Sequence, residues 1–137
     1  MRKQDTYTIR IPKLKLFGYH GCYDEEKEKG QEFEIEVEIT ITPSDIDRLW
    51  DEHINPLKLE DMIDYSEVEN KIKHTFNIRR YDLLEQLAAE ISAAPYGVAI
   101  GRQIHSEITS VSVTIRKNNP MGMSVPYIEL KYINYNE

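Results

Sequence analysis

The sequence predicts an α+β domain, in which a four-stranded antiparallel sheet carries two helices on one face. Two strand-like segments come first, two helix-like segments follow, and two more strand-like segments end the chain. Strands and helices do not alternate, which disfavours a parallel doubly wound sheet. The 137 residues, 40% of them hydrophobic, suffice for one core and are too few for two. A single domain over residues 1–137 is therefore expected.

The first two strands give the clearest local signals. Residues 7–19 alternate between apolar and polar, and Pro12 interrupts them, which predicts a bulge or an edge position. A polar loop is expected over residues 24–30, where Gly30 permits a positive φ. Over residues 31–42 every second side chain is apolar, which predicts a sheet with one buried and one solvated face. These apolar residues are Phe33, Ile35, Val37, Ile39 and Ile41.

Two helices are expected in the middle of the chain. Ser66–Glu69 has the form of a capping box, and apolar residues at helical spacing follow it. The second helix is expected to open at Asp82–Glu85 and to end at Pro95 and Gly97. Its buried stripe comprises Leu83, Leu84, Leu87, Ala88 and Ile91.

The last two strands are expected at residues 107–117 and 125–135. Their apolar faces comprise Val111, Val113 and Ile115 in the third strand, and Ile128, Leu130 and Tyr132 in the fourth. Residues 43–62 are less regular, with a turn expected at Asn55 and Pro56.

Composition disfavours several classes of protein. Cys22 is the one cysteine, so no intrachain disulfide can form, and a reducing, cytoplasmic compartment is expected. A net charge of −7 without a basic patch argues against nucleic-acid binding. No apolar stretch approaches the roughly 18 residues that cross a bilayer, and the N-terminus lacks the apolar region of a signal peptide. No Cys/His cluster predicts a metal site.

Four motifs resemble the dihydroneopterin aldolase family, and they occur in the family's order. Gly18–Gln31 resembles the loop between its first two strands, and Leu59–Val68 resembles the segment that leads into its first helix. Tyr81–Glu90 is similar to the start of its second helix, and Val113–Pro120 to the end of its third strand. One such motif would be weak, but four in order, covering nearly the whole chain, are specific.

Two segments depart from the family pattern. Residues 46–57 form a longer connection than is usual, and residues 118–126 replace a commonly proline-rich stretch. The lid over the substrate is therefore expected to differ from that of other members.

The resemblance implies the tunnelling fold. In this fold four subunits join their sheets into a barrel, two rings commonly stack as an octamer, and the sites lie between neighbouring subunits. A homo-oligomer, either a tetramer or an octamer, is therefore expected. Closing a barrel would also remove the exposed edges of a four-stranded sheet.

The resemblance also implies a reaction of tetrahydrofolate biosynthesis. The substrate is 7,8-dihydroneopterin, and retro-aldol cleavage gives 6-hydroxymethyl-7,8-dihydropterin and glycolaldehyde. The pterin C=N bond accepts the electrons once its nitrogen is protonated, so no metal, Schiff base or other cofactor is expected. The protein needs only ring recognition and positioned proton transfer.

Residue roles follow from the match to the family motifs. Lys117 corresponds to the acid/base lysine, and Tyr65 to a tyrosine that a neighbouring subunit supplies for proton transfer at the tail. Glu26 corresponds to the glutamate near the tail hydroxyls. Glu85 corresponds to the glutamate that holds the pterin amino group and ring N–H, and Leu84 to a residue with main-chain contacts.

Each of these residues also has a purely structural interpretation. Glu85 could complete a capping box begun by Asp82, and Tyr65 could pack at a helix entrance. Lys117 and Glu26 could be solvated charges. The family match favours the functional roles. His20 is interpreted as a structural loop residue, and Cys22 has no evident base partner that would make it a nucleophile.

Two alternative functions remain open. An epimerase acting on dihydroneopterin or its triphosphate would share the fold and Glu85. A triphosphate calls for basic residues near the tail, whereas the loop around Glu26 has mixed charge. A non-catalytic pterin-binding protein would need neither Tyr65 nor Lys117.

Overall fold

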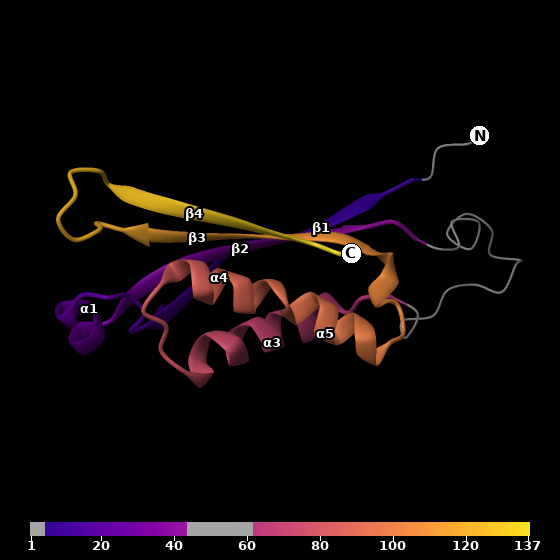
Figure 1. The fold of residues 1–137 in the computed structure, drawn as a ribbon, viewed down its shortest axis with the longest axis horizontal. Helices are drawn as coiled ribbons and strands as arrows, with labels where there is room; N and C mark the ends of the chain where they lie inside the picture. The colour runs from indigo at the N-terminus through magenta and orange to yellow at the C-terminus, as the bar shows by residue number, and fades with distance from the viewer. Residues whose placement is uncertain (1–4, 44–61) are drawn as a thin grey trace, which may run out of the picture.

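The computed structural model describes residues 5–43 and 62–137. The expected long connection at residues 46–57 and the turn at Asn55 and Pro56 lie outside the described residues. The elements in chain order are β1 (Tyr7–Gly18), α1 (Asp24–Lys29), β2 (Gln31–Ile41), α3 (Tyr65–Ile78), α4 (Leu84–Ser92), α5 (Ala94–Gly101), the 3-10 helix η2 (His105–Glu107), β3 (Ile108–Asn118) and β4 (Tyr127–Tyr135) (Figure 1).

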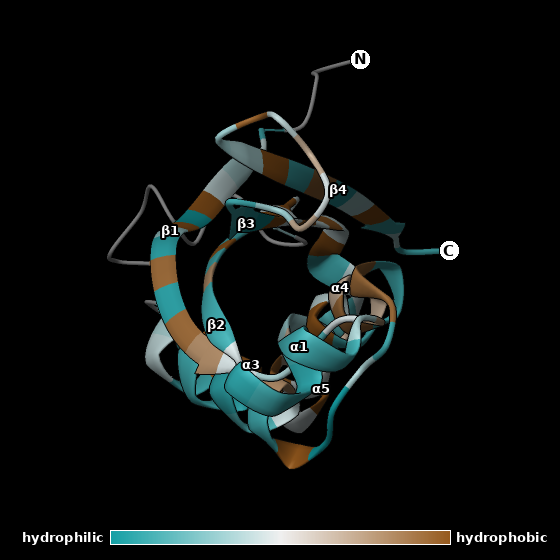
Figure 2. Ribbon diagram, turned by 90° about the vertical axis from the view of Figure 1, so that its left-hand side faces the viewer, coloured by the Kyte–Doolittle hydropathy of each residue, from teal (hydrophilic) through white to brown (hydrophobic). Residues whose placement is uncertain are grey.

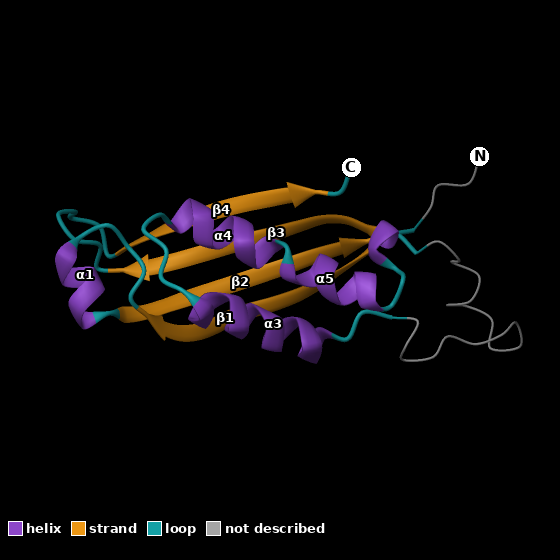
Figure 3. Ribbon diagram, turned by 60° about the horizontal axis from the view of Figure 1, so that its bottom comes forward, coloured by secondary structure: helices purple, strands orange, loops and turns teal. Residues whose placement is uncertain are grey.

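The four strands form one antiparallel sheet in the order β1-β2-β3-β4. Helices α3, α4 and α5 cover one face of it (Figure 3). This confirms the α+β expectation, with α5 as an addition to the two helices expected there. Alternation along the strands turns the apolar side chains toward the helices, and the apolar and polar bands are visible along β1 in Figure 2. The fully buried strand residues include Phe33, Ile35, Val37, Ile39, Val111, Val113 and Ile115.

Pro12 has both of the features expected of it. β1 is an edge strand of the described sheet. An edge strand tolerates proline, which has no N–H group to donate to a neighbouring strand. The register against β2 shifts between Ile11 and Leu14, and Lys13 has a φ of 53°. A bulge therefore lies at the interruption.

The polar loop expected at residues 24–30 is wrong, because this segment contains α1. Three acidic residues in its first turn suit the positive end of the helix dipole. Gly30 ends the helix with a φ of 66°, in agreement with the expected positive φ. A helix of six residues without an apolar stripe leaves no periodic signal in the sequence, which explains why it was missed.

The expected starts of the two main helices are also wrong. The N-cap of α3 is Asp64, whose carboxylate accepts a hydrogen bond from the Ser66 backbone N–H at 3.0 Å, so Ser66 already lies inside the helix. The N-cap of α4 is Leu83, which makes no side-chain cap bond. Asp82 forms an ion pair with Arg80 and does not open the helix.

Helical structure also continues past the end expected at Pro95 and Gly97. α4 ends at Ser92, and α5 begins at Ala94, with Pro95 in its first turn. The first N–H groups of a helix have no partner within it, so proline is accepted at this position. Pro95 therefore begins a helix and does not end one. Among the described residues, no helix is long and apolar enough to cross a membrane.

Candidate active site

A buried ion pair lies at the end of the sheet beside α1. Lys117 is the last buried residue of β3, on the same face as Val113 and Ile115, so strand alternation turns its side chain toward the core. Its Nζ contacts Oε2 of Glu26. The Lys117 side chain is 10% exposed and that of Glu26 is 6% exposed. Neither residue is a solvated surface charge, which removes the structural interpretation of both.

Three neighbours hold the Glu26 carboxylate in place. Its Oε1 accepts from the Tyr23 backbone N–H at 3.2 Å, and its Oε2 accepts from the Gln31 side-chain amide at 3.3 Å. Gly21 lies against the same carboxylate, with a φ of 135°. A Cβ at this position would come within 2.6 Å of the carboxyl carbon, so only glycine fits there without displacing Glu26.

Burial lowers the pKa of Lys117, and the Cys22 side chain opposes the shift. A lysine with a lowered pKa gives up its proton more readily than one in water. In contact with a carboxylate, it forms a pair suited to general acid–base chemistry.

A backbone hydrogen bond connects the segment just before α4 to Gly21, which lies against this pair. Tyr81, three residues before Leu84, is buried, and its carbonyl accepts from the Gly21 N–H at 2.9 Å. Leu84 is buried, while Glu85 is exposed at the second helical position. Because the N-cap is Leu83, Glu85 does not occupy the third position of a capping box, and the capping interpretation of Glu85 is wrong. Its carboxylate is free to bind a ligand near the positive end of the helix.

Tyr65 does not join this group within one chain. It is the first residue of α3 and is 65% exposed, so the interpretation as a packed aromatic is wrong. The opposite end of α3 contacts the site, since the Phe76 carbonyl bonds to His20. At 1.5 Å per residue, the eleven residues from Tyr65 to Phe76 span about 16 Å.

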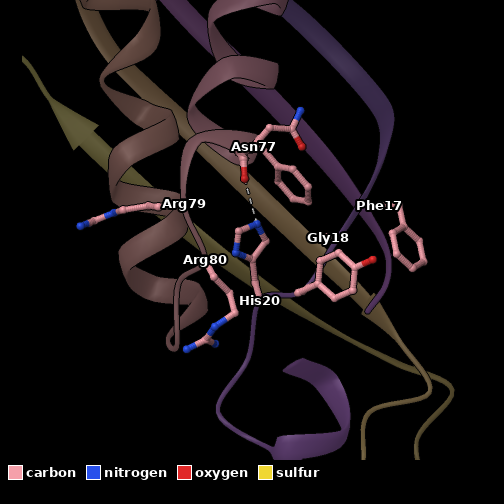
Figure 4. A pocket seen from close by; sticks show the side chains of 8 residues that line it. Phe17, Gly18, His20, Asn77, Arg79 and Arg80 are labelled. Atoms are coloured by element: carbon pink, nitrogen blue, oxygen red, sulfur yellow. Dashed lines mark hydrogen bonds between the residues drawn. The ribbon is translucent and has the colours of Figure 1, made fainter. Parts of the chain in front are cut away.

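His20 is buried and bonded to the backbone on both sides of its ring. Its Nε2 lies 3.1 Å from the Phe76 carbonyl oxygen (dashed line, Figure 4), and its Nδ1 accepts from the Tyr81 N–H at 3.0 Å. Burial is the main cause that lowers its pKa. These contacts agree with the interpretation as a structural loop residue. Cys22 is exposed.

A hollow of about 240 Å³ lies beside His20, between the end of β1 and the end of α3 (Figure 4). Its lining residues are Phe17, Gly18, Tyr19, His20, Phe76, Asn77, Arg79 and Arg80. The Glu26–Lys117 pair is not part of this lining.

Comparison with known proteins decides the family. The family model described as FolB, dihydroneopterin aldolase, matches residues 9–131. The chain belongs to the dihydroneopterin aldolase family. This confirms the resemblance that the four motifs indicated. A search of the curated proteins finds no match to the chain.

Solved structures of the dihydroneopterin aldolase family share the fold. The FolB protein from Vibrio cholerae aligns with a TM-score of 0.69 at 15% identity, over 98% of this chain and 100% of the other. The dihydroneopterin aldolase from Burkholderia thailendensis, bound to guanine, gives 0.68 at 14% identity, over 97% and 93%. The E. coli dihydroneopterin aldolase, in complex with neopterin, gives 0.67 at 15% identity, over 93% and 98%.

The sequence motifs indicated the candidate residues Glu26, Lys117 and Glu85 but not the residues that support them. The sequence alone did not single out Gly21 and Gln31 as partners of Glu26, or Tyr81 as the link to α4. Gly21 stands three residues after Gly18 in the printed sequence, but nothing in the sequence showed that its missing side chain makes room for the Glu26 carboxylate. The link to Tyr81 and the contact of Glu26 with Lys117 join residues that are far apart in the sequence.

Proposed function

We propose that the protein is a 7,8-dihydroneopterin aldolase. The observation that carries this proposal is the buried contact between Lys117 and Glu26, beside a helix N-terminus that presents Glu85. An acid/base pair and a separate carboxylate for ring recognition are what a retro-aldol cleavage of a pterin requires. Family membership supports the same activity, as does the neopterin complex of the E. coli relative.

In this proposal Glu85 and the backbone of Leu84 hold the pterin ring. A carboxylate accepts the amino group and the adjacent ring N–H as a pair of parallel, charge-assisted bonds. The ring is then fixed while the tail extends toward Glu26. Such positioning lowers the entropic part of the barrier to reaction.

Proton transfer then drives the cleavage. The ring nitrogen of the C=N bond is protonated, with Lys117 acting directly or through a water. Loss of the proton from a tail hydroxyl, assisted by Tyr65 of a neighbouring subunit, breaks the carbon–carbon bond and releases glycolaldehyde. The bonding electrons pass into the protonated C=N system, and protonation of the remaining carbon gives the hydroxymethyl product. Lys117 exchanges protons and forms no covalent bond.

We propose a homo-oligomer, a tetramer or an octamer, in which the subunit sheets join into a barrel. The position of Tyr65 supports this, because about 16 Å of helix separates it from the end of α3 that contacts the site. Both β1 and β4 are edge strands of the described sheet, and the exposed side chains of β4 include Tyr132, Ile133 and Tyr135. Pairing between copies would satisfy those edges and bring Tyr65 to the site of a neighbour.

Product identification tests the proposed function. Purified protein is incubated with 7,8-dihydroneopterin, and the pterin product is identified by mass and chromatography. The expected result is 6-hydroxymethyl-7,8-dihydropterin with glycolaldehyde, unaffected by a chelator and without an adduct trapped by borohydride. An isomer of unchanged mass would instead indicate an epimerase, and a parallel assay with the triphosphate would show which form is preferred. Binding without turnover would indicate a non-catalytic pterin-binding protein.

A further inference from the structure

Three hydrogen bonds fasten the segment before α1 to the connection between α3 and α4. The His20 Nδ1 accepts from the Tyr81 N–H at 3.0 Å, and the Gly21 N–H donates to the Tyr81 carbonyl at 2.9 Å. The Arg80 guanidinium donates to the Gly21 carbonyl at 2.8 Å. Both segments are loops, so these bonds fix a geometry that neither element provides by itself.

This fastening joins the two halves of the proposed site. On one side, Gly21 packs directly against the Glu26 carboxylate that contacts Lys117. On the other, Tyr81 lies four residues before Glu85, which is proposed to hold the ring. The distance between the acid/base pair and the ring-binding carboxylate therefore depends on how His20 and Gly21 sit against Tyr81.

The hydrogen bonds also fix the form of the His20 ring. A backbone N–H can only donate, so Nδ1 must be unprotonated to accept from Tyr81. Nε2 then carries the proton and donates to the Phe76 carbonyl, which can only accept. The ring is buried among Phe33, Phe76 and Tyr81, with centroids 4.5–5.6 Å away. It is held as one neutral tautomer, and its one ring proton is already bonded to the Phe76 carbonyl and is not offered to a ligand.

We propose that His20 is a positioning residue for the cleavage reaction, which acts through its Nδ1 bond to Tyr81 to set the spacing between Glu26–Lys117 and Glu85. This inference rests on the proposed function, because it concerns the turnover of dihydroneopterin. It assigns His20 no contact with the substrate. Misplacement of reacting groups by about 1 Å can cost on the order of 10²-fold in rate, so a small change in this spacing would be measurable.

Two substitutions by amide residues distinguish the two hydrogen bonds of the His20 ring. The side-chain oxygen of His20→Asn lies near the former Nδ1 and can accept from Tyr81, but Asn is too short to reach Phe76. The amide of His20→Gln reaches the former Nε2 position and can donate to Phe76, but it leaves the Tyr81 N–H without its acceptor. Each variant keeps one polar contact, and both lose the aromatic ring, so they are matched for the lost packing.

The experiment measures kcat for 7,8-dihydroneopterin, the Kd of neopterin, and the exchange rates of the Tyr81 and Gly21 amide hydrogens. We expect His20→Gln to lower kcat by about 10–100-fold, with Kd within about threefold of wild type and faster exchange at both amides. We expect His20→Asn to keep kcat within about threefold of its value in the wild type. Circular dichroism confirms that both variants are folded.

Three outcomes would overturn the inference. They are a His20→Gln variant with near-normal kcat, equal losses of kcat in both variants, or a loss of neopterin affinity in proportion to the loss of kcat. Equal losses would mean that the ring serves only for packing. Wild-type protein that does not cleave the substrate would refute the proposed function, whereas amide exchange would still report whether His20 fastens the two segments.

Discussion

The burial of the Lys117 side chain follows from its position in β3. Alternation along β3 puts residues 111, 113 and 115 in the core, and the same rule puts the lysine there at the strand end. A charged group so placed requires a partner, and Glu26 supplies it. The result is a cation whose pKa is lowered by burial, available next to a fixed carboxylate.

Substitution of this lysine should affect the chemical step more than binding. We expect Lys117→Ala to lower kcat by about 10²–10⁴-fold, the usual range for general acid–base catalysis, while neopterin affinity falls much less. Burial lowers the pKa of Lys117. In the wild-type rate profile, the acid form of this lysine should therefore be lost at a pH below the ordinary lysine pKa. Steady-state kinetics between pH 6 and 10 measure kcat and its pH profile. Lys15 is an exposed lysine of the same sheet, and Lys15→Ala serves as the control. Near-normal turnover in Lys117→Ala would contradict the proposed mechanism.

Glu85 should behave in the opposite way. We expect Glu85→Ala to weaken neopterin binding by about 1.5–3 kcal/mol, as for loss of hydrogen bonds to a charged group. Isothermal titration at pH 7 measures the affinity, and the exposed neighbour Gln86 provides the control variant Gln86→Ala. Since Glu85 makes no capping bond, thermal stability should change little. Unchanged affinity in a folded Glu85→Ala protein would show that the carboxylate does not hold the ring.

At the scale of elements, the ends of helices were the least accurately predicted features. Two residues near the start of α3, Asp64 and Ser66, can act as N-caps, and sequence alone does not rank them. The chain takes Asp64, whose carboxylate accepts from both the N–H and the hydroxyl of Ser66. Asp64 also lies 3.7 Å from Arg102, a contact from beyond α5 that the local sequence does not reveal.

This assignment predicts different effects for two neighbouring alanine substitutions. Asp64→Ala removes the acceptor at the helix start and should lower Tm by a few degrees, roughly the scale of a lost N-cap. Ser66→Ala keeps the backbone donor and should lower Tm less. Hydrogen bonds from Ser66 lower the pKa of Asp64. The contribution of Asp64 to stability is therefore fully present above the ordinary aspartate pKa and is lost as the pH falls through the lower pKa of the folded protein. Thermal melts from pH 7 to 3 should show the Tm values of the wild type and of Asp64→Ala converging in acid. A larger loss of Tm in Ser66→Ala than in Asp64→Ala would instead indicate Ser66 as the cap.

At the scale of the whole molecule, the proposed site needs residues from two copies of the chain. Helices cover one face of the sheet, β1 and β4 are its edge strands within the described residues, and Tyr65 begins α3 at the end opposite the one that contacts His20 (Figure 1). A ring of copies would complete the sheet and the site together.

Subunit mixing tests this arrangement directly. Tyr65→Phe and Lys117→Ala proteins should each be nearly inactive. After they are dissociated, mixed in equal amounts and reassembled, about one quarter of the sites should receive Lys117 from one subunit and Tyr65 from its neighbour, and activity should return accordingly. Light scattering of the wild type should give a tetramer or octamer mass. A fully active monomer, or no recovery on mixing despite reassembly, would contradict a site shared between subunits.

The sequence by itself determined the class of fold and the family. Periods of two and of about 3.6 residues reflect which side chains face the core, and this local property can be read without coordinates, as in Phe33–Ile41 and in Leu84–Ile91. The family motifs indicated Glu26, Lys117 and Glu85 as candidate site residues by their order along the chain.

Only the tertiary structure decided how those residues meet. The contact between Glu26 and Lys117 and the two hydrogen bonds of His20, to Phe76 and Tyr81, join segments that are distant in the chain. Helix boundaries were decided in the same way, since Asp64 and Leu83 begin helices and Pro95 lies within one. Such features depend on which donors and acceptors come together after the chain has packed, and that information is not present in any local stretch of sequence.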